Sequence, residues 1–254
     1  MTRPFKLHLG EMKFNGINVR ISSKATIGKN VQIGDGTTIC DNVVIGDNSV
    51  IANDCVIGEP TTAYYASDSH KNEPTIIGKN ALIRSHTIIY EDVCIGDNFQ
   101  TGHRVTIREK SAIGNNCGIG TNCDLQGYLT IGNHCHFHSD VHVCQYTSIG
   151  DFVFIYPGVV LANDKHPPTT NVKGPSIGNY TQIGIQSSII GDVSIGENCF
   201  IGAATVITKS YADFSFILGS PAIKKGDVRE LLDEKGNPLY PWKDRFSRGM
   251  PWQS

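Results

Sequence analysis

Aliphatic side chains recur at every sixth position along most of this 254-residue chain. The series runs from Ile27 to Ile57, resumes from Ile77 to Leu161 and returns from Ile177 to Ile207, and 22 of its 27 positions are isoleucine. An amphipathic helix would repeat its apolar positions at about 3.6 residues, and a half-buried strand would repeat them at two. A fixed period of six therefore predicts a solenoid built from short, similar units.

The residues around each phased position indicate a short strand followed by a sharp corner. Small or branched side chains stand two residues earlier, as at Val31 and Thr37, and on a strand they would face the same way as the phased residue. Glycine often follows the phased residue, as at Gly28, and asparagine stands two residues later, as at Asn30; both tolerate positive φ. Three units per turn predict a narrow prism of about nine coils with parallel stacked strands.

This repeat resembles that of the hexapeptide-repeat, left-handed β-helix acyltransferases over about residues 21–224. The resemblance implies an all-β fold, a left-handed parallel β-helix, and it alone supplies the hand, because parallel crossovers are generally right-handed. We expect an N-terminal segment at 1–20, the β-helix at 21–224, and a short C-terminal helix and tail at 225–254. The stretch from Asp227 to Lys235, followed by Gly236, is typical of a helix with a stop signal.

Two insertions interrupt the repeat, at 58–76 and 162–176. When the units are counted in threes, both insertions follow the third face of a coil, so both loops should leave the prism at the same corner. Five coils lie between them, which separates the loops by roughly 24 Å at the usual interstrand spacing. Because side chains would fill the prism, an active site has to lie outside it, in loops or between subunits.

The second insertion carries Asn163, Asp164 and His166, with a proline next. The galactoside and maltose acetyltransferases of the resembled family carry their catalytic histidine before a proline at the same offset, so the resemblance implies that His166 is catalytic. Sugar N-acyltransferases of the family often show a similar Asn-Asp there. Asn163 and Asp164 are therefore expected to bind substrate.

A dense histidine cluster at 134–142 raises a zinc hypothesis. The γ-class carbonic anhydrases, which share the prism, place two ligands in a His-x4-His pair, and no pair in this cluster has that spacing. The histidines also occupy different positions of the repeat, so they should point to different edges of the coil. We expect no metal. The other polar or aromatic substrate-site candidates are Tyr64, Tyr65, His103, Glu109, His136 and His142.

The C-terminal coils resemble the coenzyme A segment of the same family, through residues 200–209 and the later Gly-Ser-Pro-Ala at 219–222. The stretch at 182–185, one coil earlier, departs from the family's Trp-Ile-Gly-Ser and keeps its glycine. The resemblance implies that the cofactor-binding residues are Gly184, Ala203, Thr208 and Lys209.

Composition changes this picture little. The net charge is −2 and the basic residues are scattered, which argues against a nucleic-acid partner. No signal-peptide pattern or membrane-length apolar run is present, so we expect a cytoplasmic protein without a membrane contact. Five of the eight cysteines occupy inward positions, where they should act as small core side chains. These are Cys55, Cys117, Cys123, Cys135 and Cys199.

The sequence therefore predicts an acyl-CoA-dependent N-acyltransferase that acts on the amine of an amino sugar, nucleotide-linked. Acetyl-CoA or another acyl-CoA would be the co-substrate. The resemblance also implies a homotrimer with sites between subunits. A sugar O-acetyltransferase is the closest alternative, because the His-Pro signature comes largely from that branch. A γ-carbonic-anhydrase-like zinc enzyme and an inactive binding scaffold are the more distant ones.

Overall fold

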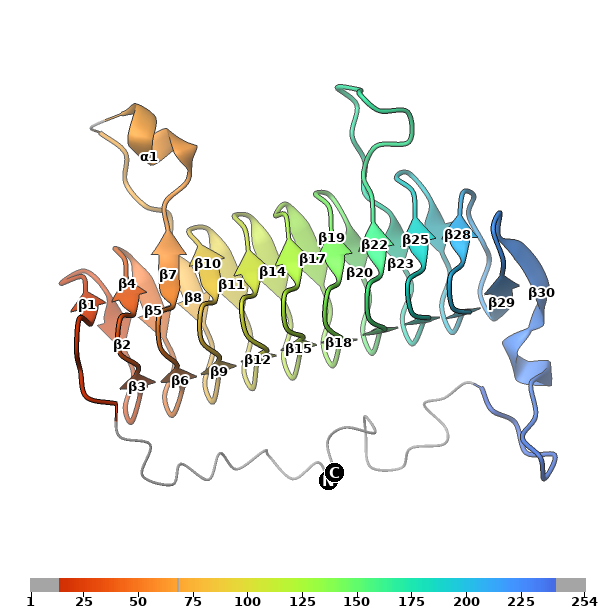
Figure 1. Cartoon of the computed structure of the whole chain (residues 1–254), viewed down its shortest axis with the longest axis horizontal. Helices are drawn as coiled ribbons and strands as arrows, with labels where there is room; N and C mark the ends of the chain where they lie inside the picture. Colours follow the sequence, from red (N-terminus) through yellow and green to blue (C-terminus); the bar gives the residue numbers. More distant parts are fainter. Residues whose placement is uncertain (1–13, 68, 241–254) are drawn as a thin grey trace.

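The computed structural model describes residues 14–67 and 69–240 and shows a long three-sided prism (Figure 1). Its sides are three sheets, which we name A, B and C. Sheet A consists of β1 (Arg20–Ile21), β4 (Thr38–Ile39), β7 (Val56–Glu59), β10 (Ile88–Tyr90), β13 (Thr106–Ile107), β16 (Asp124–Leu125), β19 (His142–Val143), β22 (Val160–Leu161), β25 (Ser188–Ile189) and β28 (Val206–Ile207).

The other two sides follow the same order along the prism. Sheet B consists of β2 (Thr26–Ile27), β5 (Val43–Ile45), β8 (Thr75–Ile77), β11 (Val93–Ile95), β14 (Ser111–Ile113), β17 (Leu129–Ile131), β20 (Ser148–Ile149), β23 (Ser176–Ile177) and β26 (Ser194–Ile195). Sheet C consists of β3 (Gln32–Ile33), β6 (Val50–Ile51), β9 (Leu82–Ile83), β12 (Gln100–Thr101), β15 (Gly118–Ile119), β18 (His136–Phe137), β21 (Phe154–Ile155), β24 (Gln182–Ile183), β27 (Phe200–Ile201), β29 (Ser215–Leu218) and β30 (Ile223–Asp227).

The fold is an all-β, left-handed parallel β-helix, as predicted. Phased residues of successive coils pair in register, for example Ile89 with Ile107 and Leu125 with Val143. The coil count is higher than the predicted nine, because the sheets hold ten, nine and eleven strands. The repeat seen in the sequence begins at Ile27 and ends at Ile207. The structure has a further strand, β1, before Ile27 and another, β29, after Ile207.

The phased residues and the residues two positions earlier form one continuous core along the prism. The five cysteines predicted to point inward are all buried, so their role as core side chains is confirmed. Each buried aliphatic side chain contributes roughly 1.5–3 kcal/mol relative to an exposed one. Because each coil buries its stripe against its neighbours, no coil would be stable alone.

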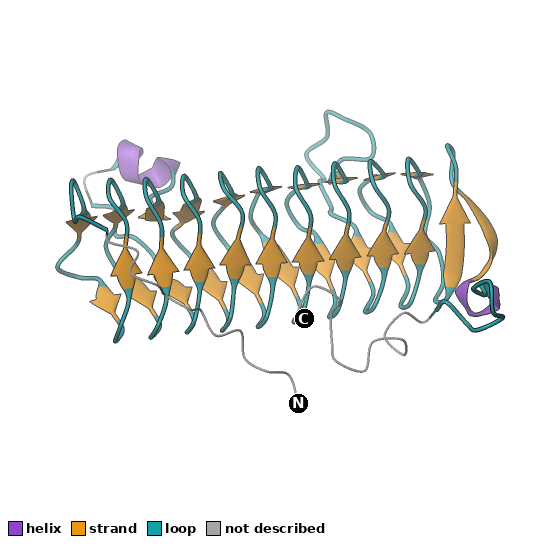
Figure 2. Cartoon of the chain, turned by 60° about the horizontal axis from the view of Figure 1, so that its bottom comes forward, coloured by secondary structure: helices purple, strands orange, loops and turns teal. Residues whose placement is uncertain are grey.

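The corner residues explain the tight turns that separate the strands (Figure 2). The asparagine positions predicted to adopt positive φ do so, as at Asn30 and Asn98. The glycines that follow the phased residues have a different role from the predicted one. Gly28 does not have positive φ, but an added Cβ would lie 2.7 Å from the backbone nitrogen of Asp47 in the next coil. These glycines permit the close stacking of coils.

Both insertions leave the prism at the corner between sheets A and B, as predicted (Figure 1). The first loop joins β7 to β8 and contains α1 (Thr62–Ala66), and the second joins β22 to β23. Five strand-to-strand steps in sheet A separate β7 from β22. Sheet A therefore carries a stretch of outer face between two protruding loops.

The C-terminal helix is much shorter than predicted. Only η1 (Val228–Glu230) is helical, because β30 pairs antiparallel with β29 up to Asp227 and the Asp227 side chain then accepts the backbone N–H of Arg229. Helical structure in the described part of the chain is limited to α1 and η1, and neither could cross a membrane. The first 13 residues and residues 241–254 of the predicted tail lie outside the described residues.

Candidate functional site

A histidine and an aspartate lie side by side on the outer face of sheet A. His142 in β19 pairs in register with Asp124 in β16, and both side chains point outward because the next residues, Val143 and Leu125, are buried. The Nδ1 atom of His142 lies 3.2 Å from Oδ2 of Asp124, and the two side chains are 35% and 38% exposed. The pair is therefore formed by the fold and remains accessible to a ligand.

A neighbouring amide also contacts the carboxylate of this pair. The same Oδ2 of Asp124 accepts a hydrogen bond from Nε2 of Gln126, over 3.2 Å. When His142 donates from Nδ1 to the carboxylate, its Nε2 becomes the acceptor. No described residue hydrogen-bonds this Nε2. An imidazole held in this way can accept a proton from an attacking nucleophile.

Sequence reasoning proposed His142 as a substrate contact and did not consider Asp124. The signal that could have found the pair was the spacing of 18 residues, which places two side chains at the same outward position in adjacent coils. The period of six says which residues face outward. It does not show which of the outward polar residues take part in a functional site.

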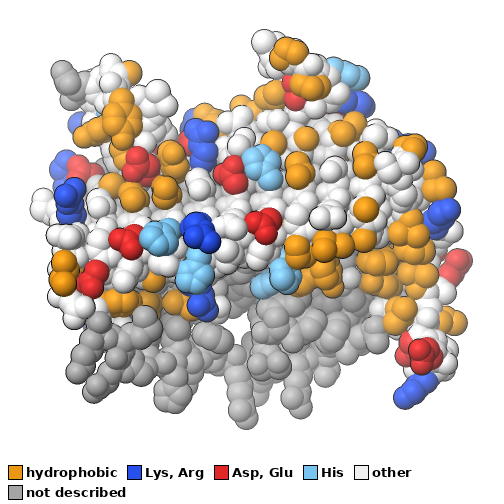
Figure 3. Space-filling model, in the orientation of Figure 1, with side chains coloured by type: hydrophobic (Ala, Val, Ile, Leu, Met, Phe, Trp, Pro, Cys, Tyr) orange, Lys and Arg blue, Asp and Glu red, His pale blue; other side chains and the backbone are white. Residues whose placement is uncertain are grey.

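Charged side chains continue along the same face toward the first loop (Figure 3). Arg108, just after β13, donates from Nε and Nη2 to the two carboxylate oxygens of Glu109, over 3.1 and 3.0 Å. Its guanidinium carbon also lies 5.5 Å from the centroid of the Tyr90 ring. Glu109, predicted as a substrate contact, is thus already paired with a cation.

The second loop holds the three residues that were predicted from its motif. The Asp164 carboxylate accepts the backbone N–H groups of His166 (3.0 Å) and Thr169 (2.9 Å), so it shapes its own loop. The carbonyl oxygen of Asn163 accepts the N–H of Lys173 (2.8 Å) and closes the base of the loop. The His166 side chain is exposed, and in the described part of the chain no contact joins it to the Asp124–His142 pair.

The remaining substrate candidates lie in three other places. Tyr64 and Tyr65 are on α1 of the first loop and are 51% and 71% exposed. His103 lies at the corner between sheets C and A, where its Nδ1 is 2.8 Å from Oγ of Ser85. His136 is on the outer face of sheet C, with its ring stacked 5.3 Å from that of Phe154. Of the predicted residues, the structure brings His142 and Glu109 next to complementary groups in the stretch of sheet A between the loops.

The environment of His136 also differs from that of the pair on sheet A. Burial, and secondarily the nearby His138, lowers the pKa of His136 to about 4. Its imidazole is therefore neutral at pH 7. It faces a different side of the prism from His142.

The predicted cofactor residues lie in the last coils. Ala203 is exposed at the corner that precedes β28, and Thr208 and Lys209 are exposed just after that strand, so they flank opposite ends of β28. Gly184 has a structural role as well, because an added Cβ would lie 2.7 Å from the backbone nitrogen of Ala203. A single ligand touching all four would have to extend across the end of sheet A.

The histidine cluster at 134–142 is only partly dispersed, because the rings of His136 and His138 meet edge to face with centroids 6.5 Å apart. His134 adopts φ 57° at a corner and stacks on Phe152, whereas His136 and His142 project from different sheets. In the described part of the chain, no three His, Cys, Asp or Glu side chains are grouped so that they could hold a metal ion.

The period of six and the prism define a hexapeptide-repeat β-helix protein. The family model described as bacterial transferase hexapeptide (six repeats) matches residues 18–59 and 174–209, at the two ends of the repeat. Repeat and fold together place the chain in the hexapeptide-repeat class of left-handed β-helix proteins. No curated protein matched the chain in a sequence search.

Several solved structures share this fold. UDP-N-acetylglucosamine O-acyltransferase from Moraxella catarrhalis RH4 is 23% identical, with 83% of this chain and 75% of that chain covered and a TM-score of 0.52. Arabidopsis UDP-N-acetylglucosamine acyltransferase is 17% identical, with coverage of 83% and 73% and a TM-score of 0.66. UDP-N-acetylglucosamine acyltransferase from Campylobacter jejuni is 18% identical, with coverage of 91% and 81% and a TM-score of 0.51. At these identities the similarity is one of fold.

Proposed function

We propose that this protein is an acyl-CoA-dependent N-acyltransferase that acts on the amine of a nucleotide-linked amino sugar. The observation that carries the proposal is the Asp124–His142 pair on the outer face of a hexapeptide-repeat prism, between two loops. The proteins of similar fold support a nucleotide-linked sugar as the acceptor, because their names describe acyl transfer to UDP-N-acetylglucosamine, and the name of the Moraxella protein specifies O-acyl transfer. The hexapeptide match supports a transferase.

In this mechanism the neutral amine of the acceptor attacks the thioester carbonyl of the acyl-CoA. The new N–C bond forms, and Nε2 of His142 accepts the proton that the nitrogen loses. Asp124 holds the imidazole through Nδ1 and stabilises the imidazolium that results. The C–S bond then breaks and coenzyme A leaves as a thiolate, which takes the proton back from His142. A backbone N–H would stabilise the tetrahedral oxyanion.

The second loop and the last coils supply the remaining roles in the proposal. Asn163, Asp164 and His166 position the acceptor from the loop, and His166 is the alternative base. Ala203, Thr208 and Lys209 contact the coenzyme A arm. The protein forms a homotrimer with sites between subunits in this proposal, and light scattering tests its oligomeric state.

A second candidate reaction is acyl transfer to a sugar hydroxyl. The Asp124–His142 pair could serve this reaction as well, and a hydroxyl depends more strongly than an amine on a base that removes its proton. In the amine reaction the departing thiolate can itself accept the proton. The two reactions would use the same residues and differ in the acceptor atom.

The experiment that tests the proposal measures thiol release from a panel of acyl-CoA thioesters, with matched amino and hydroxy sugars, free and nucleotide-linked, as acceptors. The expected result is fastest release with a nucleotide-linked amino sugar and a product carrying a new amide. An ester product would assign the hydroxyl reaction. Absence of thiol release with every acceptor would overturn acyl transfer from coenzyme A.

A further inference from the structure

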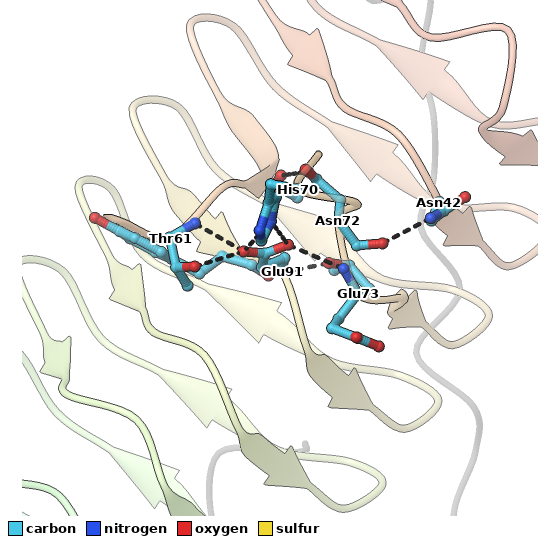
Figure 4. Close-up of polar contacts among 9 residues, drawn as sticks. Asn42, Thr61, His70, Asn72, Glu73 and Glu91 are labelled. Carbon is cyan, nitrogen blue, oxygen red and sulfur yellow. Dashed lines mark hydrogen bonds and ion pairs between the residues drawn. The ribbon is translucent and has the colours of Figure 1, made fainter. Parts of the chain in front are cut away.

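One buried carboxylate, that of Glu91, fastens the first loop to the body of the prism (Figure 4). Its side chain is only 2% exposed. Oε1 accepts the backbone N–H and the hydroxyl of Thr61, over 2.8 and 2.7 Å, and Oε2 accepts the backbone N–H of Glu73 over 2.9 Å. Nε2 of His70 lies 3.0 Å from the same Oε2. Glu91 thus joins both ends and the middle of the loop.

These hydrogen bonds favour the ionised carboxylate of Glu91. Burial by itself raises the pKa of this carboxyl, but the hydrogen bonds from Thr61, His70 and Glu73 outweigh burial, and the pKa is lowered. The Asn72 amide adds a further tie by donating to the carbonyl oxygen of Gly58 over 3.0 Å. Buried polar groups that are fully paired in this way hold one geometry. The loop residues that contact Glu91 are therefore held in one geometry on the prism.

The same loop presents two tyrosines to solvent. None of the residues of α1 is buried, so Tyr64 and Tyr65 add nothing to the core. Their rings meet edge to face, with centroids 5.1 Å apart and an interplanar angle of 84°, and Tyr64 also meets the ring of anchored His70 at 6.0 Å. The carboxylate of Glu59 raises the pKa of Tyr65, which keeps the phenol neutral. The loop offers two preformed aromatic surfaces at right angles.

The face of sheet A then leads from this platform to the Asp124–His142 pair. Four strand-to-strand steps, roughly 19 Å, separate β7 at the root of the loop from β19. Arg108 stands after β13, halfway between them, and is 37% exposed. Glu109 occupies Nε and Nη2 of Arg108, and the N–H groups of Nη1 remain to donate to a phosphate.

We propose that a nucleoside-diphosphate-linked acceptor lies along this face in one direction. Its planar base stacks on the more exposed ring, that of Tyr65, and meets Tyr64 at its edge. Its diphosphate meets Arg108, and its reacting group reaches His142. Glu91 is the positioning residue that holds the base-binding platform. This inference rests on the proposed function and adds the orientation of the acceptor and the role of the first loop.

The first test uses isothermal titration of the full chain with UDP, GDP and ADP and with the matching nucleosides. Tyr65→Ala should weaken binding of the preferred diphosphate and of its nucleoside by about tenfold each, because a base stacked on an aromatic ring is lost. Tyr156→Ala, which removes another exposed tyrosine from the sheet C side, is the control and should leave both affinities unchanged.

The second test separates the phosphate contact and the anchor. Arg108→Gln should weaken the diphosphate about tenfold and leave the nucleoside unchanged. Glu91→Gln should weaken both, as Tyr65→Ala does, while coenzyme A affinity stays at the wild-type value. Glu73→Gln is the matched control, because only the backbone of Glu73 contacts the anchor. Limited proteolysis should show new cleavage within 58–76 in Glu91→Gln alone, which confirms that the prism itself remains folded.

The outcomes decide the inference independently of the acyl-transfer reaction. Wild-type protein that binds none of the three diphosphates, or a Tyr65→Ala variant that binds as tightly as wild type, would overturn it. Nucleotide binding without any thiol release would instead leave the inference standing and refute the proposed function. Thiol release that is equally fast with free and nucleotide-linked acceptors would support acyl transfer and contradict the orientation.

Discussion

The two loops leave the prism at the same corner, but they are held in different ways. The first loop is fastened to the prism by Glu91, a residue of the next coil, whose buried carboxylate takes hydrogen bonds from several loop residues. The second loop is shaped mainly by its own Asp164, which accepts two N–H groups within five residues of itself. The first loop is therefore held by the body of the prism, whereas the second is held mainly within itself.

In the sequence the two loops have similar features. Each is an insertion after the third face of a coil, and each carries polar or aromatic side chains. Only the first loop has a buried anchor among the described residues. This difference is the reason why we propose substrate recognition at the first loop and the chemistry on the sheet face between the two loops.

The largest expected effect tests whether the chemistry lies on the sheet or on the second loop. His142→Ala should lower the rate of acyl transfer at least 100-fold, because the positioned base is lost. His166→Ala should lower it about tenfold through poorer placement of the acceptor. Steady-state thiol release measures both. The reverse order of the two effects would move the base to the second loop.

Removing the anchor of the first loop should have the next largest effect. Glu91→Ala leaves the N–H groups of Thr61 and Glu73 and the His70 ring without their partner, which costs about 3 kcal/mol of local stability. Cleavage of native protein within 58–76 by a broad-specificity protease should then be about 100-fold faster. A cleavage rate equal to wild type would show that the loop is not held by this carboxylate.

Acid should weaken the body of the prism between the loops, through His136. Its folded-state pKa is lowered to about 4 from 6.5, so between these values the unfolded chain binds more protons and unfolding becomes easier as pH falls. Between pH 7 and 5 this one group should reduce the free energy of unfolding by about 2 kcal/mol.

His136→Phe, which preserves stacking on Phe154, should remove that part of the pH dependence. His86→Asn is the matched control: His86 has φ 61°, a conformation that asparagine also tolerates, and it is exposed. Denaturant unfolding at both pH values measures the change. If His136→Phe loses as much stability as wild type, the acid sensitivity belongs to other groups.

The smallest expected effect concerns the internal turn of the second loop. Asp164→Ala removes two hydrogen bonds at an exposed site, which costs about 1 kcal/mol locally. Protease cleavage within 162–176 should be about fivefold faster, well below the change expected in the first loop after Glu91→Ala. An equal or larger change would mean that the second loop is the more strongly anchored of the two.

The fold was predictable to a large extent because its signal is repeated many times. Each coil must bury phased aliphatic residues, such as Ile89 and Ile107, and must turn three corners, as at Asn98. The same requirements therefore recur in every coil. The glycine role was misassigned, because close approach between Gly28 and the Asp47 backbone depends on the next coil. The predicted C-terminal helix is too long. Residues up to Asp227 pair with β29 as strand β30, which leaves only a short helical turn after them.

The candidate site was predictable only in part. The loop motif identified Asn163, Asp164 and His166, and the outward position identified His142, and each of these assignments remains a proposal. Asp124 and Glu91 were not singled out. Their partners stand 18 to 30 residues away in the chain, and an outward polar residue has no periodic pattern that marks it as part of a pair.

The sequence by itself determined the prism, its three faces, the common corner of the two loops and the buried cysteines, because burial imposes the same period on every coil. Only the tertiary structure decided that His142 meets Asp124 and that Glu91 holds the first loop. The physical reason is that burial acts on every unit alike, whereas a hydrogen bond between side chains depends on which two residues the winding of the chain brings within about 3 Å.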